Sequence, residues 1–254
     1  MTIIFGIYVG DGDGKASGIA IGADEMKHKN KKNVYNVGNN TLFGYASSNY
    51  KLPGIMAILE RYSAELDSDL ESGLRKARAE LLEIADGEDT LLFAGLTDSR
   101  EPIMAKVVLN GARKSGRKSL SMRFIDEKAV AGGAEPFGIM KINTLLNEYS
   151  KRNSRIGMDE TKKLIFIMIK DITSAGIFDT GDNVDIGVLK KSANGAYTTR
   201  IETPDFEEAY KAFRRERLGA LDKALRQERG NADIASILRT DIKSTDQGRE
   251  KAKR

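Results

Sequence analysis

Hydrophobic and polar positions along the chain alternate in short stretches that differ in their period. Runs of β-branched and aromatic residues predict strands, and apolar residues three and four positions apart predict helices. By these criteria strands are expected at 2–9, 18–24, 33–37, 41–46, 90–97, 102–110, 119–126, 183–191 and 196–202. Helices are expected at about 53–66, 70–84, 139–149 and 159–175, with 129–137 leading into the third of them.

The order of these elements bears on the fold class. Helix pairs separate runs of strands, whereas a parallel doubly wound sheet needs strands and helices that alternate. We therefore expect an α+β protein in which two stacked sheets carry helix pairs on their outer faces, over residues 1–203.

The remainder of the chain, 204–254, has a different pattern. After Pro204 the sequence is helical and densely charged, with an apolar stripe that is expected to pack on its own domain or on a neighbouring subunit. The final stretch, QGREKAKR, is expected to be disordered. Residues 204–254 are thus predicted to be a charged helical extension.

Composition excludes several kinds of partner. Among 254 residues, 41 basic and 37 acidic side chains leave a net charge of only +4, which does not favour nucleic acid or an anionic membrane as a partner. No apolar run is long enough for a membrane span, and the N-terminus has no signal-peptide pattern. A cytoplasmic protein is the expectation.

The scarcity of cysteine and histidine removes whole mechanisms. The chain has no cysteine and one histidine, His28, so thiol chemistry and multi-histidine zinc sites are excluded, and no cofactor or metal is expected. A Ser-His-Asp triad would need His28, which lies in the basic run MKHKNKK that is typical of a solvated turn. The glycines of GDGDGK (10–15) fit a hairpin connection better than a phosphate-binding loop.

Several stretches, taken in order, resemble the proteasome β-subunit family, including its bacterial relatives that partner an ATPase. They span roughly residues 2–200: TIIFGI, GIAIGAD, HKNKKNVYNV, TLFGYASS, VAGGAEPFGI and NVDIGVL. The resemblance implies the family's four-layer αββα sandwich, the N-terminal nucleophile hydrolase fold. It also implies the family's chemistry, in which the hydroxyl of an N-terminal threonine is the nucleophile and the α-amine of that residue is the base. An α-amine, with a pKa of about 7.7–8.0, can accept a proton near neutrality, whereas a lysine at about 10.4 cannot without a large shift.

The resemblance assigns roles to individual residues. Thr2 would be nucleophile and base once Met1 is removed, Asp24 would be the carboxylate that closes the second strand, and Gly44 would donate its backbone N–H to the oxyanion. The family's lysine directly precedes the third strand, where this chain has Asn33. Lys32 is one residue earlier and can serve only if the turn bulges, because a one-residue shift reverses the side chain's face.

Later family positions are occupied by other residue types. The family's serine in its Gly-Ser-Gly turn falls on Gly133 or Ala134, and its next serine falls near Thr180. Its second aspartate falls near Ile177, where the nearest carboxylates are Asp171 and Asp179.

Plainer interpretations remain open for the same residues. Thr2 can be an ordinary strand residue, Asp24 a turn residue, and Lys31 and Lys32 solvated charges. Gly44 can mark a close approach of backbone to a neighbouring element instead of to a substrate.

Two classes of function follow. The first is a threonine-type peptidase or amidase acting on peptides or proteins through an acyl-enzyme on Thr2, or a ligase if an amine resolves that intermediate. The second is a catalytically inactive homologue that serves as a scaffold, assembly or binding subunit. The resemblance further implies a homo-oligomer, typically a ring, and an ATPase as a partner.

Overall fold

The structure is a computed structural model, and it describes residues 2–10, 16–24, 32–47, 51–111, 117–132, 135–152, 156–174, 183–220 and 223. The chain divides into two compact units, Met1–Phe206 and Glu207–Arg254. The sequence pattern predicts a boundary at Pro204, three residues before the start of the second unit.

The first unit contains ten strands and five helices among its described residues. The strands are β1 (Ile3–Gly10), β2 (Ala16–Asp24), β3 (Val34–Val37), β4 (Thr41–Ser47), β5 (Glu88–Leu96), β6 (Pro102–Asn110), β7 (Ser119–Ile125), β8 (Lys128–Gly132), β9 (Val184–Lys191) and β10 (Tyr197–Glu202). The helices are α1 (Leu52–Arg61), α2 (Ser63–Ser68), α3 (Leu70–Ile84), α4 (Glu135–Arg152) and α5 (Met158–Ser174).

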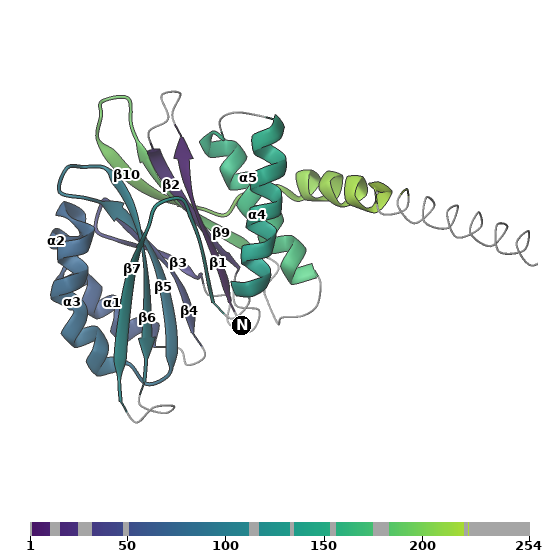
Figure 1. Cartoon of the computed structure of the whole chain (residues 1–254). Helices are drawn as coiled ribbons and strands as arrows, with labels where there is room; N and C mark the ends of the chain where they lie inside the picture. Colours follow the sequence, from purple (N-terminus) through teal and green to yellow (C-terminus); the bar gives the residue numbers. More distant parts are fainter. Residues whose placement is uncertain are drawn as a thin grey trace, which may run out of the picture. The chain divides into compact units, whose positions relative to one another are not determined.

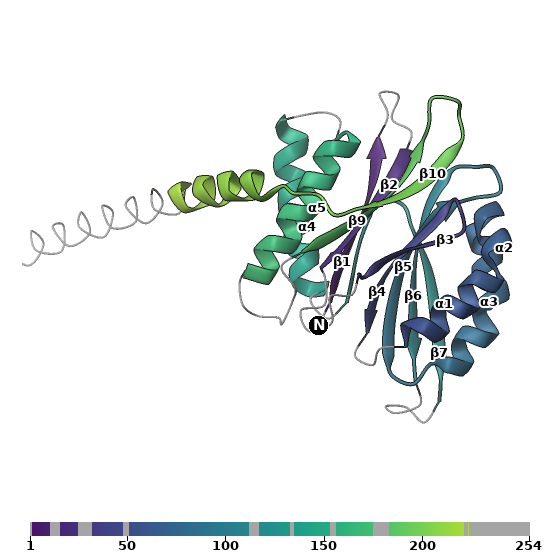
Figure 2. The ribbon, with the colours of Figure 1, turned by 180° about the vertical axis from the view of Figure 1, so that it is seen from behind.

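The strands form two antiparallel five-stranded sheets (Figures 1 and 2). One sheet has the order β10-β9-β2-β1-β8, and the other has the order β3-β4-β5-β6-β7. Helices α1–α3 pack against the second sheet, whereas α4 and α5 pack against the first. This confirms the α+β class with two antiparallel sheets and is compatible with a sandwich.

Two apolar clusters account for much of the packing. One lies between the sheets and joins side chains of β1 and β2, such as Ile4 and Ile21, to side chains of β4 and β5, such as Leu42 and Leu92. The other lies between the second sheet and α1–α3. Strands buried on both faces, such as β1 and β4, therefore read as continuous apolar runs with little alternation.

The structure differs from the predicted elements in two places. The helix expected at 53–66 is broken at Tyr62 into α1 and α2, and Asp69 then caps α3 by accepting a hydrogen bond from the Ser72 amide. Residues 128–132 form a separate strand, β8, which pairs with β1. None of the helices in the described residues is long and apolar enough to span a membrane.

The second unit is described over 207–220 and at 223. Residues 207–220 form a helix in which Lys211 pairs with Glu208 at 2.7 Å, and the Arg214 guanidinium lies over the Tyr210 ring. This helix lies within the stretch, 204–254, for which the sequence pattern predicts helix. The expected disordered end lies outside the described residues.

Candidate functional site

Three strand ends meet at one end of the paired sheets. Strand β1 begins where β2 ends, because the two are antiparallel neighbours with Ile4 opposite Ala23. Strand β3 of the other sheet begins directly after Asn33, and the side chain of Asn33 contacts Thr2 and Asp24. The topology thus gathers three polar residues, Thr2, Asp24 and Asn33, from three separate stretches of chain.

Thr2 and Asp24 are both buried, with 3% and 1% of their surface exposed. The backbone N–H of Ile3 donates a 2.7 Å hydrogen bond to Asp24 Oδ1, so the carboxyl group fixes the backbone next to Thr2. Burial raises the pKa of Asp24 to about 7, although the Ile3 hydrogen bond offsets part of that effect. Asp24 can therefore exchange a proton near neutral pH.

Asn33 is fully buried and links the two sheets at this point. Its Nδ2 donates to Thr2 Oγ1 at 3.3 Å and also to the backbone carbonyl of Asp24, while the backbone carbonyl of Asn33 accepts from the Tyr45 amide at 2.8 Å. The Asp24 carbonyl can only accept, so it fixes which way the amide points. Asn33 Oδ1 is then left as a buried acceptor without a partner among the described residues.

Lys32, the lysine expected to serve the site, lies on the exposed side of the chain. Its backbone carbonyl accepts a hydrogen bond from the Tyr35 hydroxyl. Among the described residues no Lys or Arg side chain hydrogen-bonds to Thr2 or Asp24. The position next to Thr2 is taken by Asn33, the residue that directly precedes the third strand.

Gly44 lies in the middle of β4, paired with Val34 on one side and Leu92 on the other. A Cβ placed there would come within 2.6 Å of Ile4 Cγ2 and 3.2 Å of Ile21 Cγ2. The absence of a side chain is thus explained by close packing of β4 against the other sheet.

Of the other residues assigned by resemblance, the structure describes only Asp171. Gly133, Ala134, Ile177, Asp179 and Thr180 lie outside the described residues, as does His28. Asp171 lies in α5.

Two polar groups, one partly buried and one fully buried, are not marked by the sequence pattern. Lys106 on β6, with only 18% of its side chain exposed, pairs with Glu135 of α4 at 2.6 Å and donates to the Val130 carbonyl. The Tyr45 hydroxyl donates to Asp89 Oδ1 at 2.9 Å. A lysine at an inward position of a strand pattern is a signal that could have marked Lys106.

The chemistry available at Thr2 is that of a hydroxyl with a hydrogen-bond donor, a titratable carboxyl and an unpartnered amide oxygen around it. Among the described residues no group of three or more histidine, aspartate or glutamate side chains could hold a metal ion. Searches of protein-family models and of curated protein sequences find no match to this chain.

Proposed function

We propose that the protein is an N-terminal nucleophile hydrolase of the proteasome-like type, a threonine peptidase or amidase that acts through an acyl-enzyme on Thr2. The observation that carries the proposal is the buried polar cluster at Thr2: its hydroxyl accepts from Asn33, and the adjacent amide is held by Asp24. A strand residue that serves only packing needs neither contact. The two-sheet architecture with helices on outer faces is what the αββα hydrolase fold requires.

In the proposed reaction Thr2 is the first residue of the mature protein. Its α-amine takes the hydroxyl proton as Oγ1 bonds to the carbonyl carbon of the substrate, and the C–N bond of the substrate then breaks. The leaving amine departs with that proton, and the acyl group stays on Thr2 as an ester. Water hydrolyses the ester, releasing the acid and restoring the hydroxyl; an amine in place of water gives ligation instead.

Asn33 and Asp24 act as positioning residues in this proposal. Asn33 donates to Oγ1 and so orients the hydroxyl, as an uncharged replacement for the family's lysine. Its Oδ1, which has no partner among the described residues, provides an acceptor for an N–H of the Thr2 amine. Asp24 holds the Ile3 amide and thereby the backbone that carries the amine.

The test uses protein purified from its native host and an epoxyketone that is directed at N-terminal threonine. Such a reagent reacts with both the hydroxyl and the free amine of one residue, and its full mass is retained. The expected result is loss of Met1 and one reagent mass on Thr2, with no adduct on the Thr2→Ala variant. Retained Met1, or no adduct on Thr2, would sink the proposal.

A catalytically inactive scaffold is the second candidate, and two observations favour it. Thr2 is only 3% exposed, and the close approach at Gly44 is accounted for by Ile4 and Ile21. A scaffold of this kind would keep the fold and resist the epoxyketone. The labelling experiment therefore separates the two candidates.

The resemblance also extends the proposal to assembly. A homo-oligomeric ring in the cytoplasm, with an ATPase as partner, is the arrangement typical of the resembled family. Native mass spectrometry of the purified protein tests the ring: a single closed oligomer supports it, and a monomer contradicts it.

A further inference from the structure

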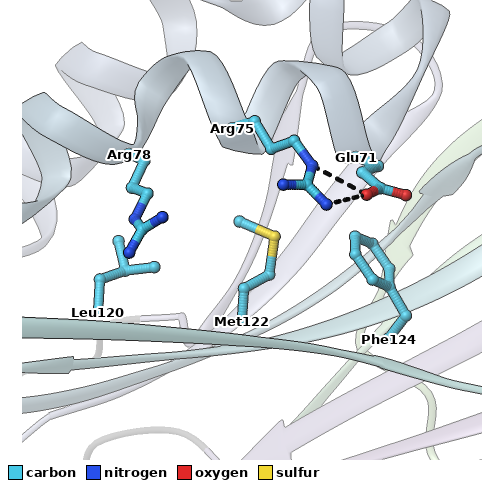
Figure 3. Close-up of a pocket in the computed structure, with 6 residues that line it drawn as sticks. All are labelled: Glu71, Arg75, Arg78, Leu120, Met122 and Phe124. Carbon is cyan, nitrogen blue, oxygen red and sulfur yellow. Dashed lines mark hydrogen bonds and ion pairs between the residues drawn. The ribbon is translucent and has the colours of Figure 1, made fainter.

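A groove runs between helix α3 and strand β7, on the face of the second sheet that carries the helices (Figure 3). Its volume is about 330 Å³, which is in the range of ligand-binding pockets. Leu120, Met122 and Phe124 of β7 form its apolar floor, and α3 contributes Glu71, Arg75 and Arg78.

The strand that forms this floor is an edge of the sheet. The other three sheet edges are short or engaged: β3 has four residues, β8 packs against α4, and β10 bonds through Thr199 to the Asn39 carbonyl. Strand β7 has seven residues, pairs with β6 alone, and its backbone from Ser119 to Phe124 makes no other hydrogen bond to a described residue. An extended chain could add to this edge as another strand.

The charge of the groove is positive. The Arg75 guanidinium donates to Glu71 Oε1 at 2.9 Å, so this pair is neutral overall. Arg78 is exposed and has no ion pair or hydrogen bond among the described residues. One guanidinium is therefore available to a negative group above the apolar floor.

We propose that β7 and the groove beside it bind an extended acidic segment of a partner protein by strand addition. Alternating residues of that segment would point into the groove, where apolar side chains contact Met122 and Phe124 and carboxylates reach Arg78. A second copy of the chain fits less well, because pairing β7 with itself would place the same basic side chains, Arg78 and Arg123, on both sides of the seam. This inference does not depend on the proposed function.

The test is fluorescence anisotropy with labelled peptides on the full chain. The probe has seven residues, the length of β7, and its odd positions, which share one face of an extended chain, are glutamate, valine, valine and glutamate with threonines between them; the same peptide with lysine in place of glutamate is the charge-reversed control. The glutamate peptide should saturate, with an affinity that falls as salt rises, and the lysine peptide should not bind. Arg78→Glu should weaken binding by roughly tenfold, whereas Arg200→Glu, an exposed charge reversal on β10, should leave it unchanged.

Backbone methylation separates strand addition from charge attraction. Two further glutamate peptides carry N-methyl groups on either the odd or the even residues, and only one of these sets faces β7 in an added strand. One methylated peptide should lose binding and the other keep it. Equal binding by both, no binding of the parent peptide, or a homodimer that Arg78→Glu dissolves would each overturn the proposal.

Discussion

Two polar clusters in the first unit are built in opposite ways. Around Lys162 of α5, the ammonium lies 2.9 Å from Asp159 and 3.1 Å from Glu202, with 14% of its side chain exposed. Burial lowers the pKa of Lys162, but its hydrogen bonds to Asp159 and Glu202 outweigh that effect and raise it. The hydrogen bond between Lys162 and Asp159 also lowers the pKa of the Asp159 carboxyl group.

The cluster at Thr2 lacks such compensation. Asp24 is buried without a side-chain cation bonded to it among the described residues, its pKa is raised, and Asn33 Oδ1 has no partner. In a cluster that contributes to stability, the charged groups have partners of opposite charge. In a catalytic cluster, some buried polar groups lack such partners, which costs folding free energy. The contrast supports the proposal of a functional site at Thr2 and assigns the Lys162 cluster to stability.

The largest stability effect is expected from Asp24→Asn, which keeps an oxygen acceptor for the Ile3 amide but removes the buried charge. The folded pKa of about 7 lies above the unfolded value, so the folded wild type binds more protons between about pH 4 and 7 and loses stability as pH rises through that range. At pH 8 the variant should be more stable than wild type by a few kcal/mol, on the order of what the shift implies. Urea unfolding of both proteins at pH 5 and pH 8 measures the free energies of unfolding. The same difference between variant and wild type at both pH values would contradict the prediction.

Asn33→Asp tests the amide that joins the three strand ends. The change removes the donor to Thr2 Oγ1 and to the Asp24 carbonyl and places a carboxylate against that carbonyl, which can only accept, so the free energy of unfolding should fall by about 1–3 kcal/mol. Asn36→Asp, an exposed position on β3, the strand that follows Asn33, is the matched control and should change it little. Equal effects at both positions would mean that the buried contacts contribute nothing.

Gly44→Ala tests whether the glycine is explained by packing. The new methyl group would lie 2.6 Å from Ile4 Cγ2, and overpacking of this kind costs about 1–3 kcal/mol. Gly10→Ala is the control, since nothing lies within 4 Å of its Cβ position. The midpoint of thermal unfolding should fall in Gly44→Ala and stay unchanged in Gly10→Ala. Unchanged stability in Gly44→Ala would show that the two sheets can move apart enough to accommodate a methyl group.

Lys162→Met is expected to have the smallest effect. The change removes the closer of the two cations that pair with Glu202, which keeps Arg200 at 3.5 Å, and a partly exposed pair contributes about 1 kcal/mol. The loss should shrink as salt is added. Lys211→Met, in the exposed pair with Glu208, should have no measurable effect in the same urea titration. A loss of stability that does not depend on salt would mean that the aliphatic part of the Lys162 side chain contributes through packing alone.

Much of the fold could be predicted because it is local. The strands β1, β2 and β4 are apolar runs, and α3 and α5 show helical spacing, so their positions follow from the residues themselves. Strand β8 could not be separated from the helix that follows it, because pairing with β1 decides it. The groove at β7 was also not predictable, since it arises where α3 passes over an edge strand.

The site was only partly predictable, for a related reason. Thr2 and Asp24 could be chosen through the family resemblance, but Lys32 and Asn33 differ by one residue, and only the start of β3 decides which side chain turns inward. The sequence pattern does not encode how the preceding turn positions that start. The unpartnered Oδ1 of Asn33 is a property of three-dimensional packing alone.

The most direct measurement is the rate at which a β-lactone acylates Thr2 in wild type, Asn33→Asp and Lys162→Met, each purified from the native host and followed by intact mass. The account predicts acylation of wild type on Thr2, a rate at least about tenfold lower in Asn33→Asp, and an unchanged rate in Lys162→Met. No acylation of wild type, or equal rates in wild type and Asn33→Asp, would contradict the claim that the polar cluster at Thr2 is a catalytic site.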